Sequence, residues 1–534
     1  MGMGSGMGSG MGIWAIYFLL KFGLHLAGLI ELDLLANLLL ALLLSWPWPM
    51  RWRLPLAWLA VPAGVALLYH ESPWPPLSRL WDNWGAVSDF SLAYLFELGA
   101  RIINAPMLAA LLVGSVVLAG LGTRLRLSVW VYVGLAVLAL MPSPAERARA
   151  EQLAQVVRTA PSGASDNGPI DLADLDRTLQ AFHDGERAKT LKFPQDGGPP
   201  PFDLVILSLC SLSWDDLDHA KLADAPFMRR FDVVFDRFNS GATYSGPAVL
   251  RLLHANCGQV PQGELYGGAR AECLLMRGLE QAGYQTSVLL NHDGRFDGFA
   301  DTLRRDSALP SMPEQVLDAP VAMTGFDGSP IRDDGEVLSR WWQARALSAG
   351  PSRVALLYNS ISLHDGNRVP GISSISSLDT YAPRARKLLD DLDRFVDGIE
   401  RSGRPTVVVL APEHGAAVRG DAQQVAGLRE LPTRVITHVP AGVMLLNFGI
   451  QRPADAPPVH VVQNASYQSL FTVVSALLHG GPEATEPERL VALGQALPAI
   501  EWVAENDRHI YLQRGPYGYL RTPEGRWSLM PALP

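Results

Sequence analysis

Apolar residues are concentrated at the start of this 534-residue chain, and that uneven distribution constrains its fold more than any other feature. Residues 1–12 form a low-complexity Met-Gly-Ser repeat without fold information. Several of the apolar segments that follow are shorter than the ~20 residues a membrane span usually needs, so either helix ends extend into flanking residues or the boundaries are off by a turn. We expect residues 13–142 to form an all-α transmembrane bundle of about five helices, from apolar segments at 13–30, 34–48, 54–69, 105–121 and 127–141.

The connections between these segments predict how the chain crosses a membrane. Their charge alternates, from Glu31 and Asp33 to Arg51 and Arg53, then to an acidic stretch at 71–104 and to Arg124 and Arg126. Lysine and arginine favour the cytoplasmic side. The pattern predicts a multi-pass protein with both arginine pairs inside and everything after Met141 outside.

Charge and cysteine usage agree with export. The net charge of −9 provides no basic patch, so nucleic acid is excluded as a partner. All three cysteines lie in the exported part, where a disulfide between Cys257 and Cys273 would suit an oxidising compartment. Cys210 would then be unpaired, either as a buried thiol that packs like a small hydrophobe or as a residue with a chemical role.

The exported part divides into an arm and a large domain. Residues 143–201 carry two helical patterns and end in three prolines, which mark a boundary. Residues 202–534 alternate helical patterns with buried-strand patterns at 203–210, 286–291, 353–359, 406–410 and 441–448. Such alternation predicts an α/β domain whose mainly parallel sheet has helices on both faces. The strand-like residues 508–527 predict an antiparallel appendage.

Two of these strands end in residues of types that can bind a metal. The sequence T-V-V-V-L-A-P-E-H-G places Glu413 and His414 directly after a strand, and Cys210 ends another. In open α/β sheets this edge binds ligands, and all three residue types are common zinc ligands. The alternative is structural: Glu413 would be a solvated loop residue and His414 would cap a helix.

Ser245 has two possible roles at the start of a helical pattern. Pro247 suits a first helical turn, which places Ser245 at or next to the N-cap. An N-cap serine is a common structural device. The same position suits a nucleophile for phosphoryl transfer, because free backbone N–H groups and the helix dipole favour phosphate oxygens. Bound zinc would lower the pKa of the hydroxyl, and tetrahedral Zn²⁺ accepts the four donors Cys210, Ser245, Glu413 and His414.

Five short motifs, taken in order, resemble a known family. They are L-S-L-C-S-L-S-W-D-D, G-A-T-Y-S-G-P, L-L-N-H-D-G, S-L-H-D-G-N and A-P-E-H-G. Together they are similar to the membrane-anchored phosphoethanolamine transferases of the alkaline phosphatase superfamily, and within these to the bacterial enzymes that modify cellulose. The resemblance implies an alkaline-phosphatase-like fold, a bacterial inner-membrane location, a periplasmic catalytic domain and one tightly bound Zn²⁺.

The resemblance also implies roles for individual residues. Ser245 matches the nucleophile that carries the phosphoethanolamine, and the other zinc ligands correspond to Cys210, Glu413 and His414. An active-site histidine of the family, able to act as a general acid or base or to donate a hydrogen bond, corresponds to His364.

Two residues near these ligands are similar to flanking residues of the family that contact phosphate. They are Tyr244 and Arg429. A single tyrosine or arginine is more often structural, so that alternative stays open for both.

Two related chemistries fit the sequence less well. Sulfatases carry the signature S/C-x-P-x-R, whereas the chain has Val249 at the last position and Arg251 two places later. That difference argues against formylglycine formation. Transferases that modify lipid A are resembled more distantly, and they use a threonine nucleophile with an Asp-His pair, where this chain has Ser245 and Glu413-His414.

The resemblance implies a two-step transfer of phosphoethanolamine from phosphatidylethanolamine to glucosyl 6-hydroxyls of nascent cellulose, beside the subunits of the cellulose synthase complex. Two alternatives stay open: a transferase acting on lipid A or a periplasmic glucan, and a non-catalytic scaffold of the synthase. Five further residues are either ligands for a second metal or ordinary surface and core residues: His219, His254, His292, Asp293 and Asp365.

Overall fold

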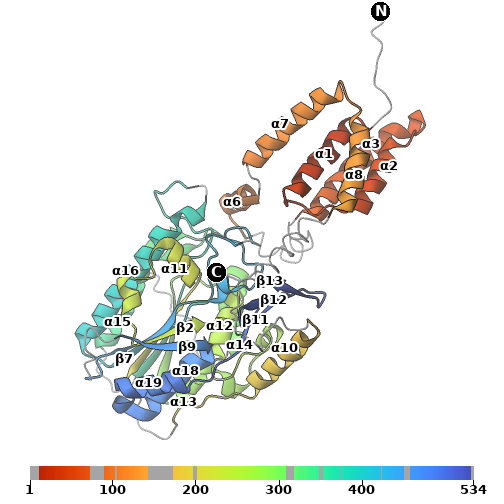
Figure 1. Cartoon of the computed structure of the whole chain (residues 1–534). Coiled ribbons are helices and arrows are strands. Elements are labelled where there is room, and N and C mark those ends of the chain that lie inside the picture. The colour runs from red at the N-terminus through yellow and green to blue at the C-terminus, as the bar shows by residue number, and fades with distance from the viewer. Residues whose placement is uncertain are drawn as a thin grey trace, which may run out of the picture. The chain divides into compact units, whose positions relative to one another are not determined.

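The structure, a computed structural model, forms two compact units (Figure 1). It describes residues 11–72, 89–102, 105–141, 172–195, 201–307, 309, 318–347, 353–374, 376–421, 424–449 and 457–530. The first unit comprises Met1–Ser88 and Gly99–Ser165, and the second comprises Asp89–Leu98 and Asp166–Pro534. A ten-residue piece of the N-terminal third therefore belongs to the second unit by its contacts.

The first unit is helical, and each of the five expected apolar segments contains a helix: α1 (Ile13–Leu26), α2 (Leu34–Ser45), α3 (Met50–Glu71), α7 (Ala105–Gly122) and α8 (Leu127–Leu140). An unpredicted helix, α6 (Leu92–Ile102), lies within the expected acidic connection, and its residues up to Leu98 belong to the second unit. Among the described residues, no single helix meets the length and hydropathy criteria for a membrane span, although Met107–Gly122 and Leu127–Leu140, bent by 120°, meet them as a pair. The five-span bundle stays a prediction.

The second unit contains the expected mainly parallel sheet, with seven strands in the order β3-β6-β1-β7-β8-β2-β9. Only β8 runs against its neighbours. The strands are β1 (Asp203–Leu209), β2 (Val233–Phe238), β3 (Tyr284–Leu290), β6 (Arg353–Ser360), β7 (Thr406–Leu410), β8 (Ala441–Leu446) and β9 (Val459–Ala465). Sequence patterns missed β2 and β9 because both interleave polar with apolar residues, as V-V-F-D-R-F and V-H-V-V-Q-N-A.

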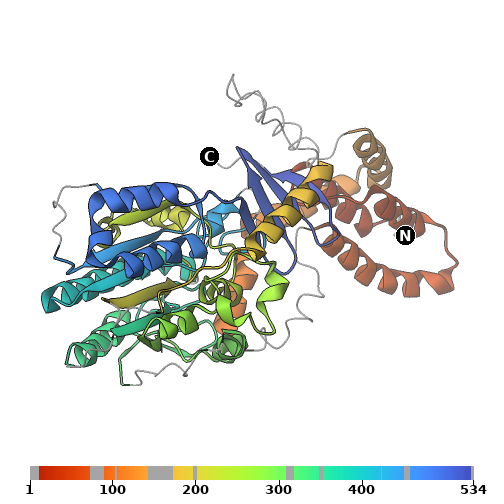
Figure 2. The same ribbon diagram turned by 90° about the horizontal axis from the view of Figure 1, so that it is seen from below.

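Helices cover both faces of this sheet, as expected (Figures 1 and 2). Alternate residues of β1 enter two different cores: Leu204 and Ile206 enter one, and Val205 and Leu207 enter the other. Burial on both sides explains the continuous apolar run of β1. One face packs on α12 (Ser245–Leu253), α13 (Leu275–Gln281), α18 (Tyr467–Gly480) and α19 (Pro487–Ala496), and the other on α11 (Trp214–Ala220), α15 (Asp334–Leu347) and α16 (Tyr381–Ser402).

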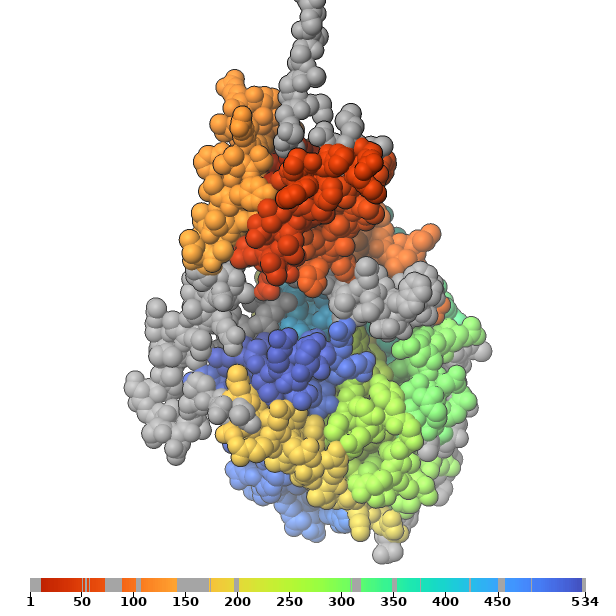
Figure 3. Space-filling model, turned by 90° about the vertical axis from the view of Figure 1, so that its right-hand side faces the viewer, coloured from red at the N-terminus to blue at the C-terminus, as the bar shows by residue number. Residues whose placement is uncertain are grey.

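Shorter elements complete the second unit. The expected C-terminal appendage is a four-stranded antiparallel sheet. Helix α10 (Leu172–Arg187) lies against it, where Asp176 accepts hydrogen bonds from Arg521 and Trp527 (Figure 3). The remaining strands and helices are β10 (Trp502–Glu505), β11 (Ile510–Arg514), β12 (Tyr517–Arg521), β13 (Trp527–Met530), the hairpin β4 (Val321–Thr324) and β5 (Pro330–Arg332), α14 (Phe299–Ser307) and α17 (Arg434–Thr437).

Of the expected arm at 143–201, the structure describes residues 172–195 and 201, while the predicted first helical pattern lies outside the described residues. The proposed boundaries at 142 and 201 stay predictions. The cysteines follow the expected pairing: Cys257 and Cys273 form a disulfide, and Cys210 is a free, buried thiol.

Candidate functional site

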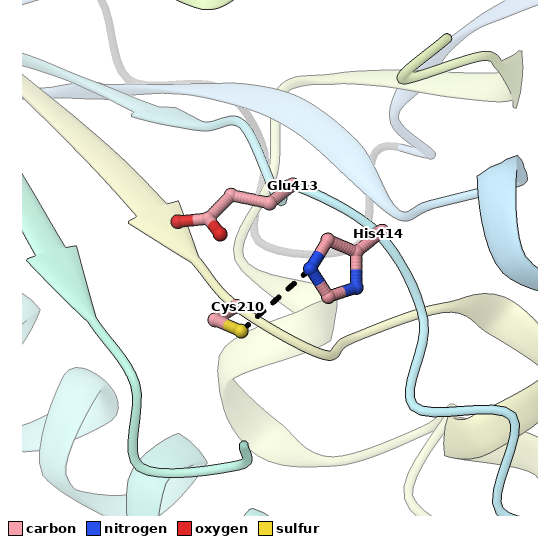
Figure 4. Close-up of side chains that lie close together, drawn as sticks. All are labelled: Cys210, Glu413 and His414. Carbon is pink, nitrogen blue, oxygen red and sulfur yellow. Dashed lines mark hydrogen bonds between the residues drawn. The ribbon is translucent and has the colours of Figure 1, made fainter. Parts of the chain in front are cut away.

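Two adjacent parallel strands bring three candidate ligands together. Because β1 pairs in parallel with β7, both strands end at the same edge of the sheet, where Cys210 follows one and Glu413 and His414 follow the other. The backbone N–H of Glu413 donates to the carbonyl of Leu209 over 3.0 Å, and that of Leu212 donates to the carbonyl of His414 over 2.7 Å. Ligand atoms of all three side chains lie within 4.8 Å of one another (Figure 4).

Ser245 reaches the same point from a different element. It is the first residue of α12, after Tyr244 at the N-cap. Its Oγ lies 3.3 Å from Cys210 Sγ and 3.3 Å from His414 Nε2. Cys210 Sγ and His414 Nε2 are themselves 3.8 Å apart (Figure 4). The structure therefore brings together all four residues that the sequence suggested as ligands, with the half-buried Ser245 on the accessible side.

Burial controls the charge of the three ligands. It raises the pKa of the Cys210 thiol to about 12, with a further contribution from the nearby Glu413 carboxylate, and raises the pKa of Glu413 to about 7. It lowers the pKa of His414 well below the ordinary value, and the charge of Arg429 acts in the same direction. A bound divalent cation would favour the deprotonated forms of all three, as expected of metal ligands.

The hydrogen bonds of Glu413 and His414 leave one ligand atom of each side chain available to bind a metal. Glu413 Oε1 accepts from Asn359 Nδ2 over 2.5 Å and from Ser208 Oγ over 3.2 Å, whereas Glu413 Oε2 is buried without a hydrogen-bond partner among the described residues. A buried carboxylate oxygen normally has a partner. His414 Nδ1 bonds the carbonyl of Gly415 over 2.9 Å, which directs Nε2 toward Cys210 and Ser245. This sulfur, nitrogen and oxygen donor set fits Zn²⁺.

Asp216 supports the loop that carries Glu413 and His414. Its carboxylate accepts from the backbone N–H of Ala416 over 2.6 Å and from that of Val418 over 3.1 Å. It also forms a capping box with Ser213 at the start of α11. Sequence reasoning missed this role, although the spacing from Ser213 to Asp216 is a recognisable capping-box signal.

Gly415 allows the loop to approach α11 closely. A Cβ atom at this position would lie 2.6 Å from Ser213 Oγ and 2.8 Å from Asp216 Oδ2. Glycine therefore lets the backbone after His414 pack directly against the capping box, which restricts where the His414 side chain can point.

The three flanking residues suggested by the sequence also lie at this edge. Arg429 donates to Ser211 Oγ over 3.1 Å, and its guanidinium carbon lies 5.5 Å from the Tyr244 ring centre. Burial and the charge of Arg429 lower the pKa of His364 to about 4. The His364 ring stacks on Phe326 with 4.3 Å between ring centres. His364 is therefore neutral at pH 7, and Arg429 is the cation near the four candidate ligands.

The residues suggested for a second metal do not gather into a site. His292 Nε2 bonds Asn359 Oδ1 over 3.0 Å, and His254 Nε2 bonds the carbonyl of Asp306 over 3.0 Å. Asp365 accepts hydrogen bonds from two hydroxyl groups. Within the part of the chain that the structure describes, only Cys210, Glu413 and His414 form a group with metal-ligand spacing.

Comparison with known proteins identifies the family. The family profile described as "Cellulose biosynthesis protein BcsG C-terminal domain" matches residues 159–527, and the "Cellulose biosynthesis protein BcsG N-terminal domain" matches residues 14–140. The "Cellulose biosynthesis protein BcsG" of Salmonella typhimurium is 35% identical over 97% of this chain and 96% of its own length. The protein of the same name from Escherichia coli K12 is also 35% identical, over the same shares of both chains.

Solved structures are similar to a lower degree. An alkaline phosphatase superfamily protein from Vibrio parahaemolyticus matches with a TM-score of 0.46 and 15% identity, covering 68% of this chain and 88% of its own. The integral membrane lipooligosaccharide phosphoethanolamine transferase A from Neisseria meningitidis matches with a TM-score of 0.39 and 13% identity, covering 89% and 90%. These likenesses are too loose to assign chemistry, and the sequence matches decide the family: the chain belongs to the cellulose biosynthesis protein BcsG family.

Proposed function

We propose that the chain is a zinc-dependent phosphoethanolamine transferase that moves this group from phosphatidylethanolamine to glucosyl 6-hydroxyls of nascent cellulose. One observation carries the proposal: Ser245 Oγ, at the N-terminus of α12, lies 3.3 Å from both Cys210 Sγ and His414 Nε2. A hydroxyl nucleophile for phosphoryl transfer needs activation and donors for the phosphate oxygens, and this arrangement offers both.

Four residues would hold the metal: Cys210, Ser245, Glu413 and His414. When bound, Zn²⁺ supplies positive charge that favours a deprotonated hydroxyl and stabilises negative charge on the phosphoryl oxygens. Ser245 is the first residue of α12, so the helix dipole adds a second source of positive potential at its hydroxyl.

The transfer then takes two steps. In the first, Ser245 Oγ gives up its proton and forms a bond to phosphorus, the bond from phosphorus to the diacylglycerol oxygen breaks, and that oxygen takes up a proton. In the second, a glucosyl 6-oxygen forms the new bond to phosphorus and releases its proton, the bond from phosphorus to Ser245 Oγ breaks, and Oγ takes up a proton to restore the hydroxyl. His364, neutral at pH 7, is the residue we assign to proton transfer or to a hydrogen bond with the phosphoryl group, and Arg429 and Tyr244 to phosphate binding.

The first unit would anchor the enzyme in the bacterial inner membrane, with the catalytic domain in the periplasm. Its helices expose large apolar side chains, among them Leu35, Leu39, Leu112, Val113 and Val129. Anchoring raises the effective concentration of a lipid donor and of a polymer that leaves the membrane at the synthase. The subunits of the cellulose synthase complex are therefore the partners we propose.

The proposal can be tested in cells that lack this protein and receive either the wild-type chain or Ser245→Ala. The wild-type chain should restore phosphoethanolamine on purified cellulose, and the variant should not, with equal amounts of both chains in the membrane. Phosphoethanolamine on lipid A or a periplasmic glucan instead of cellulose would show the alternative acceptor. Unmodified cellulose whose yield depends equally on both chains would show a scaffold.

A further inference from the structure

A segment from the N-terminal third packs beside His364. The sequence places Asp89–Leu98 between the helices of the first unit, but its contacts assign it to the second unit. Its partners are the loop 364–368, the hairpin residue Phe326 and the turn Ser377–Thr380 that precedes α16. The segment begins at this surface with a backbone hydrogen bond from Ser91 N–H to the Phe326 carbonyl over 2.9 Å.

Glu97 is the buried anchor of the segment, with a relative exposure of 1%. Its Oε1 accepts from the backbone N–H of Ser377 over 2.6 Å and from Ser376 Oγ over 3.2 Å, and it lies 3.0 Å from Ser377 Oγ. Its Oε2 forms an ion pair with Arg368. A carboxylate removed from water is tolerated only when its oxygens are satisfied in this way. These contacts connect the end of the His364 loop at Arg368 to the turn at Ser377.

Tyr94 contacts the middle of that loop. Its hydroxyl donates to Asp365 Oδ2 over 3.0 Å, and Asp365 Oδ1 accepts from Ser377 Oγ over 2.7 Å. The next residue, Gly366, has a φ of 82°, and a Cβ atom there would lie 2.7 Å from the Tyr94 ring. The loop therefore passes against the tyrosine in a conformation that only glycine adopts readily.

Aromatic stacking links the segment to the histidine ring. Phe90 packs against Phe326 with 5.8 Å between ring centres, and Tyr94 lies 5.8 Å from the same ring. Phe326 in turn stacks on His364 at 4.3 Å. The imidazole also donates through Nδ1 to the carbonyl of Asp365 over 2.6 Å. Both the ring and its backbone are thus held by residues that contact Asp89–Leu98.

We propose that Glu97 and Tyr94 are positioning residues for the transfer reaction, which act by holding the 364–368 loop so that His364 faces the Ser245 site. This inference rests on the function proposed above. Neither residue touches the four candidate metal ligands in any described contact, so their effect on transfer would pass through His364. The pre-formed position of a proton-transfer group contributes to rate when neighbouring hydrogen bonds lock its orientation.

Hydrogen exchange tests the structural half of the inference without using activity. In the full-length protein in detergent, Glu97→Gln and Tyr94→Phe should each speed amide exchange of peptides covering residues 361–369 by about tenfold, as expected for loss of one hydrogen bond to a charged group. Tyr284→Phe is the matched control, because its buried hydroxyl has no hydrogen-bond partner among the described residues. Unchanged exchange in both variants would overturn the inference, whatever the protein's function.

A double-mutant cycle tests the catalytic half. Glu97→Gln should lower kcat for transfer from phosphatidylethanolamine by about tenfold, with KM and zinc content within about twofold of wild type. In a His364→Ala background the same substitution should have almost no further effect, because its route to the reaction is gone. An equal loss in both backgrounds, or full kcat despite faster exchange, would overturn the positioning role. If the wild-type protein has no transfer activity, the proposed function is wrong. The hydrogen-exchange result would then still test whether Glu97 and Tyr94 hold the 364–368 loop.

Restoration provides the last check. Arg368→Gln should reproduce the loss of kcat, and the double variant Glu97→Gln/Arg368→Gln should recover part of it, because two amides can hydrogen-bond where one amide faces an arginine. If the double variant lost more kcat than the product of the two single losses, the ion pair between Glu97 and Arg368 would not have the proposed role.

Discussion

Ser245 Oγ and His414 Nε2 lie 3.3 Å apart although the two residues are 169 positions apart in the chain. The helix start at Ser245 follows β2, and His414 follows β7. Their meeting therefore depends on the sheet order, in which β8 alone separates these two strands. The geometry of the candidate active site depends on how the strands of the second unit pack together. Substitutions of residues around the site should therefore affect it.

Cys210 should be essential for metal affinity. Cys210→Ser replaces a thiolate with a poor hydroxyl ligand while keeping the side chain small. We expect zinc affinity to fall by more than the about 10–100-fold typical of losing an outer hydrogen-bond partner. Metal content after dialysis against a graded chelator would measure it. Equal zinc retention in wild type and variant would exclude Cys210 as a ligand.

Gly415→Ala should disturb the same site through packing. The added methyl group would overlap Ser213 and Asp216, and relief of such overlap costs about 1–3 kcal/mol and moves the loop. Zinc affinity and thermal stability should both decrease. Gly185→Ala is the matched control, since its Cβ would meet no atom within 4 Å, and in helix α10 it should raise stability by up to about 1 kcal/mol. Identical behaviour of the two variants would refute the packing argument.

The disulfide should stabilise the second unit. Cys257 and Cys273 are separated by 16 positions, and closing a loop of that size contributes about 3 kcal/mol in the chain-entropy account. Cys257→Ser/Cys273→Ser should therefore lower the apparent Tm, and reductant should lower it in wild type but not in the double variant. A reductant effect of equal size in both would point to another cause.

His438 should make stability depend on pH. Burial lowers its pKa from 6.5 to about 4, and its Nε2 donates to the carbonyl of Asp236 over 2.8 Å. At pH values between 4 and 6.5, His438 binds more protons in the unfolded chain than in the folded chain. The contribution of neutral, buried His438 to stability is therefore present above pH 6.5 and is lost as the pH falls toward 4. From pH 7 to pH 5 the loss should be about 2 kcal/mol.

The control for this effect is His438→Gln, which keeps a donor for Asp236 but does not titrate. Unfolding measured at both pH values should show that wild type loses more stability than the variant. Parallel losses in the two proteins would mean that His438 does not contribute.

Sequence patterns predicted those parts of the fold that depend on local composition. Leu204–Leu207 of β1 and Val407–Leu410 of β7 are uninterrupted apolar runs because both strands are buried on two faces, so Cys210, Glu413 and His414 could be recognised after them. Strand β9 was missed because it is an edge strand whose exposed positions include His460.

Contacts between distant segments left no local signal. Asn359 lies 54 residues from the Glu413 carboxylate that it orients, and Glu97 lies 280 residues from Ser377. In the sequence, Asp89–Leu98 resembled part of an acidic connection, because the sequence does not distinguish a carboxylate that is bonded inside the fold from a solvated one. Only Asp216 carried a usable clue, the capping-box spacing from Ser213.

The measurement closest to the central claim is the mass of the intact full-length protein after incubation with phosphatidylethanolamine and no acceptor. A single phosphoethanolamine group should accumulate, peptide mapping should place it on Ser245, and a cellulose oligosaccharide should remove it. Ser245→Ala, with zinc content and folding measured in parallel, should form no adduct. An adduct on another residue, or full transfer by Ser245→Ala, would contradict the account.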